Sequence, residues 1–485
     1  MKENSLVKNI VFSFIKTFLG VAFPLVTFAY SSRILGVDGI GQVNFARNII
    51  TYFTMIAMLG VNYYGTREVA RVRGNRIKLS CFCHEMLAIN FFMTCIAYIL
   101  LFISILFIQT LQDYTLLLLV NSFSIILTTM GMDWLYQGLE KFEYIAKRTV
   151  FFQFIAFVYM IMTVKNQSDI LNYSVVLMIS SSGANVLNFI SSYKYIDFNL
   201  FSHKYNISKH LKSILWLFVF AVSVQLYTVL DSTMLGFIKG DYAVGIYTVA
   251  IKTNKMTDTL ITSLGVALIP RLSFFIEQKE KKKVKDLINK AYNCIFMFSI
   301  PCSFGLFVLA PYVIELFGGS GFKDAIITMR ILTPIVVIIP FNVLTNIQIF
   351  IPMKKEKEVI ISSSVAAVTN FVCNAILIPY FAENGAAVAT VIAECTSAMV
   401  CYIYLRKVFN VNTIFENYYQ YWIAACPILL VGILSERYLN SSILKVFVII
   451  YVSIVLYFSI LKIMKNNYFN YIKNKIIFKK WRNKA

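Results

Sequence analysis

Long apolar runs dominate the chain and restrict its fold more than any other feature. A spanning helix needs about 20 mostly apolar residues, and fourteen ranges of the sequence reach or approach that length. The runs are continuous rather than alternating, which predicts helices and not a β-barrel. Hydrophobic residues make up 58% of the chain, which excludes an ordinary soluble protein of this length. The predicted spans are 9–34, 41–64, 84–108, 114–137, 149–164, 170–193, 213–238, 243–269, 288–316, 325–351, 358–381, 385–405, 418–436 and 442–461.

Basic residues are distributed unevenly among the connecting segments. With a cytoplasmic N-terminus, 34 of the 45 lysines and arginines fall in inner segments and 5 in outer loops. This is the positive-inside bias of membrane proteins. The sequence therefore predicts a multi-pass protein of the bacterial cytoplasmic (inner) membrane with both termini in the cytoplasm. The net charge of +21 follows from this topology, and we expect no nucleic-acid partner.

An internal repeat predicts how the spans are grouped. Leu35-Gly36 with Gly41 and Arg47 recurs as Leu235-Gly236 with Gly245 and Lys252. Six spans separate the copies, an even number, so both copies have the same orientation in the membrane. A chance similarity of two glycine-rich hairpins is the alternative. We predict an all-α protein with an N-terminal six-helix lobe (1–205), a C-terminal six-helix lobe (206–407), a central cavity, two additional helices (408–465) and a basic cytoplasmic tail (466–485).

Charged side chains inside the spans are the candidate functional groups. Charge in hydrocarbon costs about 2.5–3.5 kcal/mol on insertion scales unless it faces water or a partner. Lys252, Lys255 and Asp258 fall along one stripe of a helix, which indicates the wall of a polar pathway. Internal ion pairs that only orient helices are the alternative. The candidate substrate-binding cations are Lys16, Arg33, Arg47, Lys252, Lys255 and Arg330, and the candidate ion-coupling or gating carboxylates are Asp133, Asp231, Asp258 and Glu394.

The sequence offers little for catalysis or for a cofactor. Cys81-Phe82-Cys83-His84 resembles half of a metal site, but no second half follows, so we expect no metal and no cofactor. The predicted outer loops are short, and all three histidines fall on the predicted inner side. A membrane enzyme such as a polysaccharide polymerase would need catalytic groups near the outer face, so we expect a protein that is not an enzyme.

Several motifs, in order and at preserved spacing, resemble one family of membrane transporters. They are Ser32-Arg33-Ile34-Leu35-Gly36 through Gly41, Asp133-Trp134-Leu135-Tyr136-Gln137-Gly138-Leu139-Glu140-Lys141-Phe142, Leu230-Asp231-Ser232-Thr233-Met234-Leu235-Gly236 followed by Val244-Gly245-Ile246-Tyr247, Ala310-Pro311 with Leu316-Phe317-Gly318, and Asn384-Gly385-Ala386-Ala387-Val388-Ala389-Thr390. Together they resemble the polysaccharide transporter (oligosaccharide flippase, Wzx-like) family of the multidrug/oligosaccharidyl-lipid/polysaccharide exporter superfamily. The resemblance covers about residues 5–405.

The resemblance implies a flippase that carries undecaprenyl-diphosphate-linked oligosaccharides from the inner to the outer leaflet. It implies alternating access of a V-shaped cavity, for capsule, O-antigen or exopolysaccharide synthesis. Lys16, Arg47 and Lys252/Lys255 occupy the kinds of place where related lipid II flippases carry essential cations. The expected partners are the lipid-linked glycan, membrane lipids, and a polysaccharide polymerase with other glycan-assembly proteins.

The chemistry of such a substrate agrees with the charged residues. Its diphosphate needs a wet, cationic path, for which Arg47, Lys252 and Lys255 are the candidates. Candidate hydrogen-bond partners of the sugar hydroxyls are Asn44, Asn48, Thr51, Gln225, Tyr227 and Asn254. The alternative functions are a lipid II-type flippase, a small-molecule exporter of the same superfamily, and a scaffold of the glycan-synthesis complex.

Overall fold

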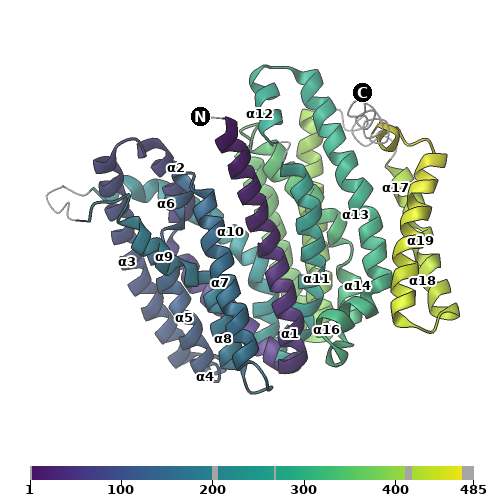
Figure 1. The fold of residues 1–485 in the computed structure, drawn as a ribbon, viewed down its shortest axis with the longest axis horizontal. Coiled ribbons are helices and arrows are strands. Elements are labelled where there is room, and N and C mark those ends of the chain that lie inside the picture. Colours follow the sequence, from purple (N-terminus) through teal and green to yellow (C-terminus); the bar gives the residue numbers. More distant parts are fainter. Residues whose placement is uncertain (1–2, 199–205, 267–268, 410–417, 472–485) are drawn as a thin grey trace. The chain divides into compact units, whose positions relative to one another are not determined.

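The computed structural model describes the backbone of residues 3–198, 206–266, 269–409 and 418–471. Side chains are described from residue 23 onward, except at several positions in 220–228 and 264–271. Within these ranges every regular element is a helix (Figure 1). The all-helical fold predicted from the apolar runs is confirmed. The chain divides into two compact units, Met1–Gly245 and Ile246–Ala485, while the lobe boundaries proposed from the sequence stay a prediction.

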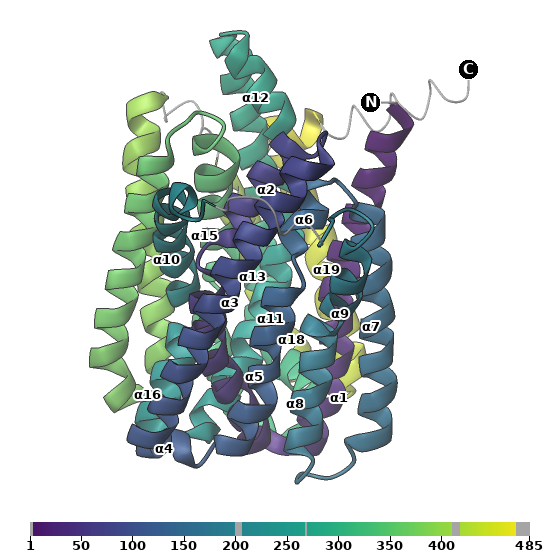
Figure 2. The same cartoon turned by 90° about the vertical axis from the view of Figure 1, so that its left-hand side faces the viewer.

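The first unit is a bundle organised around α1. This helix (Glu3–Met58) packs against α3, α5, α7, α8 and α10. Figure 2 shows α3, α5, α7 and α8 running nearly parallel, as expected for helices that cross one bilayer. The elements are α2 (Val61–Val72), α3 (Arg76–Phe107), α4 (Gln109–Gln112), α5 (Thr115–Met130), α6 (Asp133–Gly138), α7 (Phe142–Thr163), α8 (Ile170–Met178), a π-turn (Ile179–Gly183), α9 (Ala184–Ser192) and α10 (Ser208–Lys239).

The second unit begins within α11 (Asp241–Val266) and is organised around α13 (Lys281–Phe317). Helices α14, α15, α17, α18 and α19 all pack against α13. The remaining elements are α12 (Ile269–Glu277), a 3-10 turn (Ser320–Phe322), α14 (Ala325–Leu332), α15 (Ile335–Val343), a π-turn (Leu344–Phe350), α16 (Glu356–Val408), α17 (Tyr419–Ala425), α18 (Pro427–Tyr438) and α19 (Ser442–Ile463).

The helices agree with a membrane-spanning protein. Among the described residues, eight helices are long and apolar enough to cross a membrane, or nine if α14 and the bent α15 segment form one span. Each of the fourteen predicted ranges overlaps a helical segment, because α1 and α16 each hold two ranges on either side of a kink. Many large apolar side chains are exposed on the bundle surfaces, including Phe91, Phe107 and Ile443, as lipid-facing positions require.

Two glycine turns of the first unit share a conformation and pack reciprocally. Gly36 (φ 71°, ψ −173°) breaks α1, and Gly240 (φ 82°, ψ −168°) separates α10 from α11; both angles lie where a side chain is disfavoured. Five residues later, Gly41 faces the Asp241 carbonyl and Gly245 faces the Val37 carbonyl. An added Cβ would lie 1.9 Å and 2.2 Å from these oxygens.

This geometry changes the alignment of the internal repeat. The sequence pairs Gly36 with Gly236, but the backbone conformation pairs Gly36 with Gly240. Gly236 lies inside α10, where it leaves room for the ring of Phe45. With this alignment, Gly41 follows Gly36 by five residues and Gly245 follows Gly240 by five residues. Gly41 contacts Asp241, the residue after Gly240, and Gly245 contacts Val37, the residue after Gly36.

Candidate functional site

A polar cavity of about 310 Å³ lies inside the first unit, and Arg47 is one of its walls. Arg47 is half-buried on the part of α1 that follows the Gly36 kink, close to Tyr173 of α8. The other polar lining residues of this Arg47 cavity are Thr51, Thr54, Asn62, Tyr63, Asn121, Ser124, Thr128, Ser181, Ser182 and Gln225. A cation surrounded by hydroxyl and amide groups in an apolar bundle is an environment suited to a hydrated anion.

The polar wall contributed by α5 follows from its sequence. Asn121, Ser124 and Thr128 are spaced by three and four residues, so they share one face of the helix. The Asn121 amide donates to the Leu117 carbonyl at 2.8 Å and to the Ser174 hydroxyl at 3.2 Å, which fixes it against α8. These side chains supply the part of the polar lining of the Arg47 cavity that comes from α5.

A second polar cavity, of about 490 Å³, adjoins the first. Asn62, Tyr63 and Thr128 line both cavities, so the two are neighbours along α2 and α5. The residues found only in the second are Thr66, Arg67, Asp133, Gln137 and Asn185. We call it the Asp133 cavity. The two cavities together extend from Arg47 to the basic segment that begins at Arg67.

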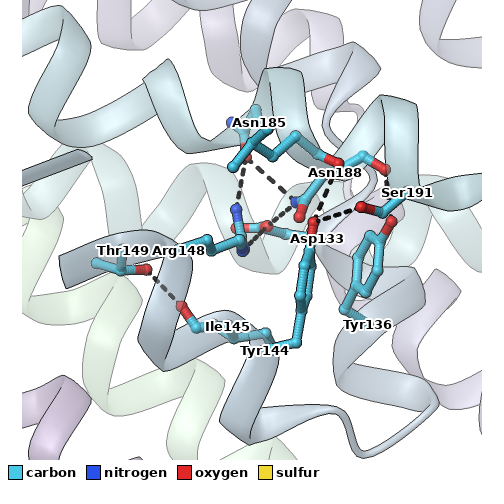
Figure 3. A network of polar contacts seen from close by, with 10 residues as sticks. Asp133, Tyr136, Tyr144, Ile145, Arg148, Thr149, Asn185, Asn188 and Ser191 are labelled. Atoms are coloured by element: carbon cyan, nitrogen blue, oxygen red, sulfur yellow. Dashed lines mark hydrogen bonds and ion pairs between the residues drawn. The ribbon is translucent and has the colours of Figure 1, made fainter. Parts of the chain in front are cut away.

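Asp133 is held by a buried polar network at the edge of this cavity (Figure 3). Its Oδ1 atom forms an ion pair with the Arg148 guanidinium and accepts a hydrogen bond from the Asn188 amide at 2.7 Å. Arg148 also donates to the side-chain amide oxygen (Oδ1) of Asn185 at 3.4 Å. The Arg148 side chain is 4% exposed, whereas that of Asp133 is 45% exposed. The network therefore fixes one carboxylate oxygen while much of the Asp133 side chain stays accessible.

Two tyrosines complete the network, and the Arg148 guanidinium lies 5.9 Å from the centre of the Tyr144 ring. The Tyr144 hydroxyl donates to the Ser191 hydroxyl at 3.0 Å, and the Tyr136 hydroxyl donates to the Asn188 carbonyl. The two rings stack with their centroids 4.9 Å apart. These contacts join α6, α7 and α9, so the position of Asp133 is set by three helices.

A group of charged residues on α11 lies within the second unit. Lys252 is half-buried, Lys255 is exposed and Asp258 is 4% exposed, so the exposure of these side chains differs along α11. Asp258 interacts through charge with Lys255 and with Glu394 of α16. Among the described residues neither Asp258 oxygen has a hydrogen-bond partner. Glu394 accepts a hydrogen bond from the Asn342 amide at 2.7 Å. The structure thus brings together Lys255, Asp258 and Glu394.

The other predicted site residues are more dispersed. Arg33 is exposed on α1. Asp231 is buried on α10 and acts through charge on Tyr52, whose hydroxyl donates to Thr233. Arg330 donates to the Phe307 carbonyl at 3.2 Å and lies over the Phe307 ring. The side chain of Lys16 lies outside the described residues.

The predicted sugar-binding residues also lie in several different places. Thr51 and Gln225 line the Arg47 cavity. Asn44 donates to the Ile40 carbonyl at 2.7 Å, and Asn254 is fully buried and donates to the Ala250 carbonyl at 3.0 Å. Asn254 also donates to the Met329 carbonyl of α14 at 3.4 Å. The side chain of Tyr227 lies outside the described residues.

Sequence reasoning missed the network around Asp133. It counted Arg148 as a loop cation, because the apolar run that predicts the fifth span begins at residue 149; the structure buries it in α7. Asn185 and Asn188 are three residues apart in an apolar span, and this spacing on one helix face was the available signal. Within the described residues, no group of three or more His, Cys, Asp or Glu side chains could hold a metal ion.

Comparisons with known proteins identify relatives by sequence. Among curated relatives, the "Putative O-antigen transporter" of Escherichia coli is 23% identical over 410 residues, which cover 83% of this chain and 98% of that protein. The "Probable low-salt glycan biosynthesis flippase" of Haloferax volcanii is 20% identical over 216 residues, which cover 44% of this chain and 45% of that protein.

Solved structures show that the fold is shared. The lipid II flippase MurJ in an inward closed conformation has a TM-score of 0.74 at 17% identity, covering 94% of this chain and 99% of MurJ. An inward-facing multidrug resistance MATE family transporter of the MOP superfamily has a TM-score of 0.64 at 18% identity, covering 84% of this chain and 99% of that transporter.

Two family models match the sequence itself. One described as MatE matches residues 217–378. The other, described as "Polysaccharide biosynthesis protein", matches residues 6–276, more than half of the 485 residues. The resemblance seen in the motifs is thereby confirmed, and the chain belongs to the polysaccharide biosynthesis protein family.

Proposed function

We propose that this protein is a flippase that moves undecaprenyl-diphosphate-linked oligosaccharide repeat units from the inner to the outer leaflet of the bacterial cytoplasmic membrane by alternating access. The products would serve capsule, O-antigen or exopolysaccharide synthesis. The observation that carries the proposal is the Arg47 cavity, a cationic and hydroxyl-rich space inside an apolar helical bundle. The names of the relatives support transport of a glycan rather than catalysis.

The physical reason lies in the substrate's head group. A diphosphate joined to several sugars cannot cross hydrocarbon, so it needs a path lined by cations and hydrogen-bonding groups. Arg47, Lys252 and Lys255 would hold the phosphates, and Lys16, Arg33 and Arg330 would serve as further cationic contacts. Lysine is a point charge without the bidentate fork of arginine, so the lysine contacts would be the looser ones. The polyprenyl tail would remain in lipid.

Four carboxylates of the helices are the candidates for coupling transport to an ion gradient. Asp258 and Glu394 interact through charge within the second unit, and neither Asp258 oxygen has a hydrogen-bond partner among the described residues. Asp133 and Asp231 complete the proposed set. Asp258→Asn and Glu394→Gln should each change how the transport rate depends on pH. An unchanged pH dependence in both variants would assign these carboxylates a structural role.

The orientation and the partners are part of the same proposal. Both termini would lie in the cytoplasm, as the uneven distribution of basic residues predicts. The partners would be the lipid-linked glycan, membrane lipids, and a polysaccharide polymerase with other glycan-assembly proteins.

The decisive experiment deletes the gene in cells whose glycosyltransferases are intact. Polyprenyl-diphosphate-linked repeat units should accumulate on the cytoplasmic leaflet and disappear when the gene is expressed again. Unchanged surface glycan without a lipid-linked intermediate would refute the proposal and favour a small-molecule exporter. Accumulation of lipid II alone would favour the lipid II-type flippase.

The same strain tests the lysines of α11. The double variant Lys252→Ala with Lys255→Ala should fail to relieve the accumulation, because the phosphates would lose two cationic contacts. Lys323→Ala is the matched control, since Lys323 is exposed in a connection outside the long helices. Equal amounts of both variants in the membrane exclude a defect in insertion. Normal export by the double variant would remove these lysines from the diphosphate site.

A further inference from the structure

The Asp133 cavity has a chemical character that differs from that of its neighbour. The contacts of Asp133 to Arg148 and Asn188 both use Oδ1, so the network fixes the carboxylate without covering it. A carboxylate held in this way has acceptor positions left for further donors. Asp133 is therefore a rigid, accessible acceptor at the wall of the Asp133 cavity.

The other lining residues can donate, accept and stack. Asn62, Gln137 and Asn185 present amide groups, which both donate and accept hydrogen bonds. Tyr63 is 51% exposed, so its ring offers a flat apolar face with a polar end. A pyranose has the matching surfaces, with pairs of neighbouring hydroxyls around its edge and an apolar face of C–H groups.

Other ligand classes fit this lining less well. A phosphate would meet the Asp133 carboxylate, and the one cation in the lining, Arg67, donates from Nε to Glu68 at 3.2 Å. A cationic ligand would have Asp133 as its single carboxylate in the lining, and the buried Arg148 already balances that charge. A neutral, hydroxyl-rich ligand makes use of all of these groups without an uncompensated charge.

We propose that the Asp133 cavity is a sugar subsite, in which Asp133 and Gln137 bind neighbouring hydroxyls of one residue of the glycan head group and Tyr63 stacks on its ring. This inference rests on the proposed flippase function and deepens it. Because the Asp133 cavity adjoins the Arg47 cavity through Asn62, Tyr63 and Thr128, a glycan whose diphosphate lies near Arg47 would extend directly into the subsite. Selectivity for the sugar would then reside in the first unit.

The test compares two lipids that differ only in the glycan. The full-length protein in lipid nanodiscs is titrated with undecaprenyl diphosphate and with undecaprenyl diphosphate carrying the repeat unit extracted from the deletion strain. The measured quantity is the dissociation constant of undecaprenyl diphosphate divided by that of the glycan-bearing lipid. This ratio reports the contribution of the sugars to binding. Gln137→Ala and Asp133→Asn should each reduce this ratio about tenfold, the size of one lost hydrogen bond to a charged or well-fixed group. Binding of undecaprenyl diphosphate alone should not change.

Gln109→Ala is the matched control, because Gln109 is an exposed amide on α4. The ratio in this variant should equal that of the wild type. Unchanged binding of undecaprenyl diphosphate shows that each variant is folded. Wild-type ratios in both Gln137→Ala and Asp133→Asn would overturn the sugar subsite and leave the proposed function intact. A wild-type protein that binds neither lipid would overturn the proposed function, and the subsite with it.

Discussion

The reciprocal packing of Gly41 and Gly245 makes a strong prediction about stability. At Gly41 an added Cβ would lie 1.9 Å from the carbonyl oxygen of Asp241 and 3.0 Å from its Cα. These are backbone atoms at the start of α11, so no side chain can rotate to make room. Gly41→Ala therefore forces α1 and α11 apart at this point.

The expected magnitude follows from the overlap. Contacts below 3.0 Å essentially do not occur, so the two backbones must separate by about 1.1 Å. Overpacking of this kind costs about 1–3 kcal/mol, and a rigid backbone partner places the cost near the upper end. Replacing a helical glycine by alanine returns up to about 1 kcal/mol. The net loss of unfolding free energy should be about 2 kcal/mol.

The assay is reversible unfolding in mixed detergent–SDS micelles, followed by circular dichroism. Gly305→Ala is the control, because Gly305 also lies inside a long helix and no heavy atom lies within 4 Å of an added Cβ. This control should be as stable as the wild type or gain up to about 1 kcal/mol. The unfolding free energies of the two variants should thus differ by about 2–3 kcal/mol. Equal stability would refute the close backbone approach at Gly41.

Three further substitutions test the network around Asp133, the loop between α7 and α8, and the kink in α16. Asp133→Ala should cost about 3 kcal/mol of unfolding free energy, because it leaves the buried Arg148 guanidinium without its anion. The double variant with Arg148→Met should recover most of this loss. No recovery would contradict the ion pair between Asp133 and Arg148. The backbone N–H groups of Lys165 and Asn166 hold the pKa of Asp169 below its ordinary value. The stabilisation from Asp169 is therefore full above about pH 4 and is lost as the pH falls through the lowered pKa. Asp169→Ala should be less stable than the wild type at pH 7, and its stability should approach that of the wild type in acid. A deficit that does not depend on pH would contradict this prediction. Ala382 has φ 48° and ψ −129° within α16, a strained conformation for any residue with a Cβ. Ala382→Gly should therefore raise the unfolding free energy by about 1 kcal/mol. A loss of stability on SDS unfolding would show that the kink is not strained.

Features that depend on local pattern were predictable from the sequence. Apolar runs give the helices, because burial in lipid requires every backbone group to bond within its own segment. The helix period also predicts that Lys252, Lys255 and Asp258 lie along one stripe of α11, and the role of this stripe as the wall of a polar pathway stays a prediction. The charge interaction between Asp258 and Glu394 could not be predicted from the sequence, because 136 residues separate them and only tertiary packing brings them together.

Features that depend on backbone conformation or on span boundaries were less accessible. Gly236 and Gly240 are both glycines near one turn, and only the φ angle shows that Gly240 corresponds to Gly36. Arg148 follows a basic loop in the sequence, so charge counting assigned it to that loop. Its burial depends on Asp133, which lies 15 residues earlier on another helix. Neither the correspondence of Gly240 with Gly36 nor the burial of Arg148 can be predicted from a local pattern of residues.

The Gly245 contact also bears on how such a protein can be divided. The boundary between the two units falls at Gly245, inside the second turn of α11, while Gly245 itself packs on the Val37 carbonyl. A gene split at this position would cut a continuous helix and end one fragment at the residue that fits against α1. Fragments for co-expression should therefore be divided elsewhere. Recombination between relatives can exchange one of the two glycine hairpins alone. Such an exchange would have to preserve both Gly41 and Gly245.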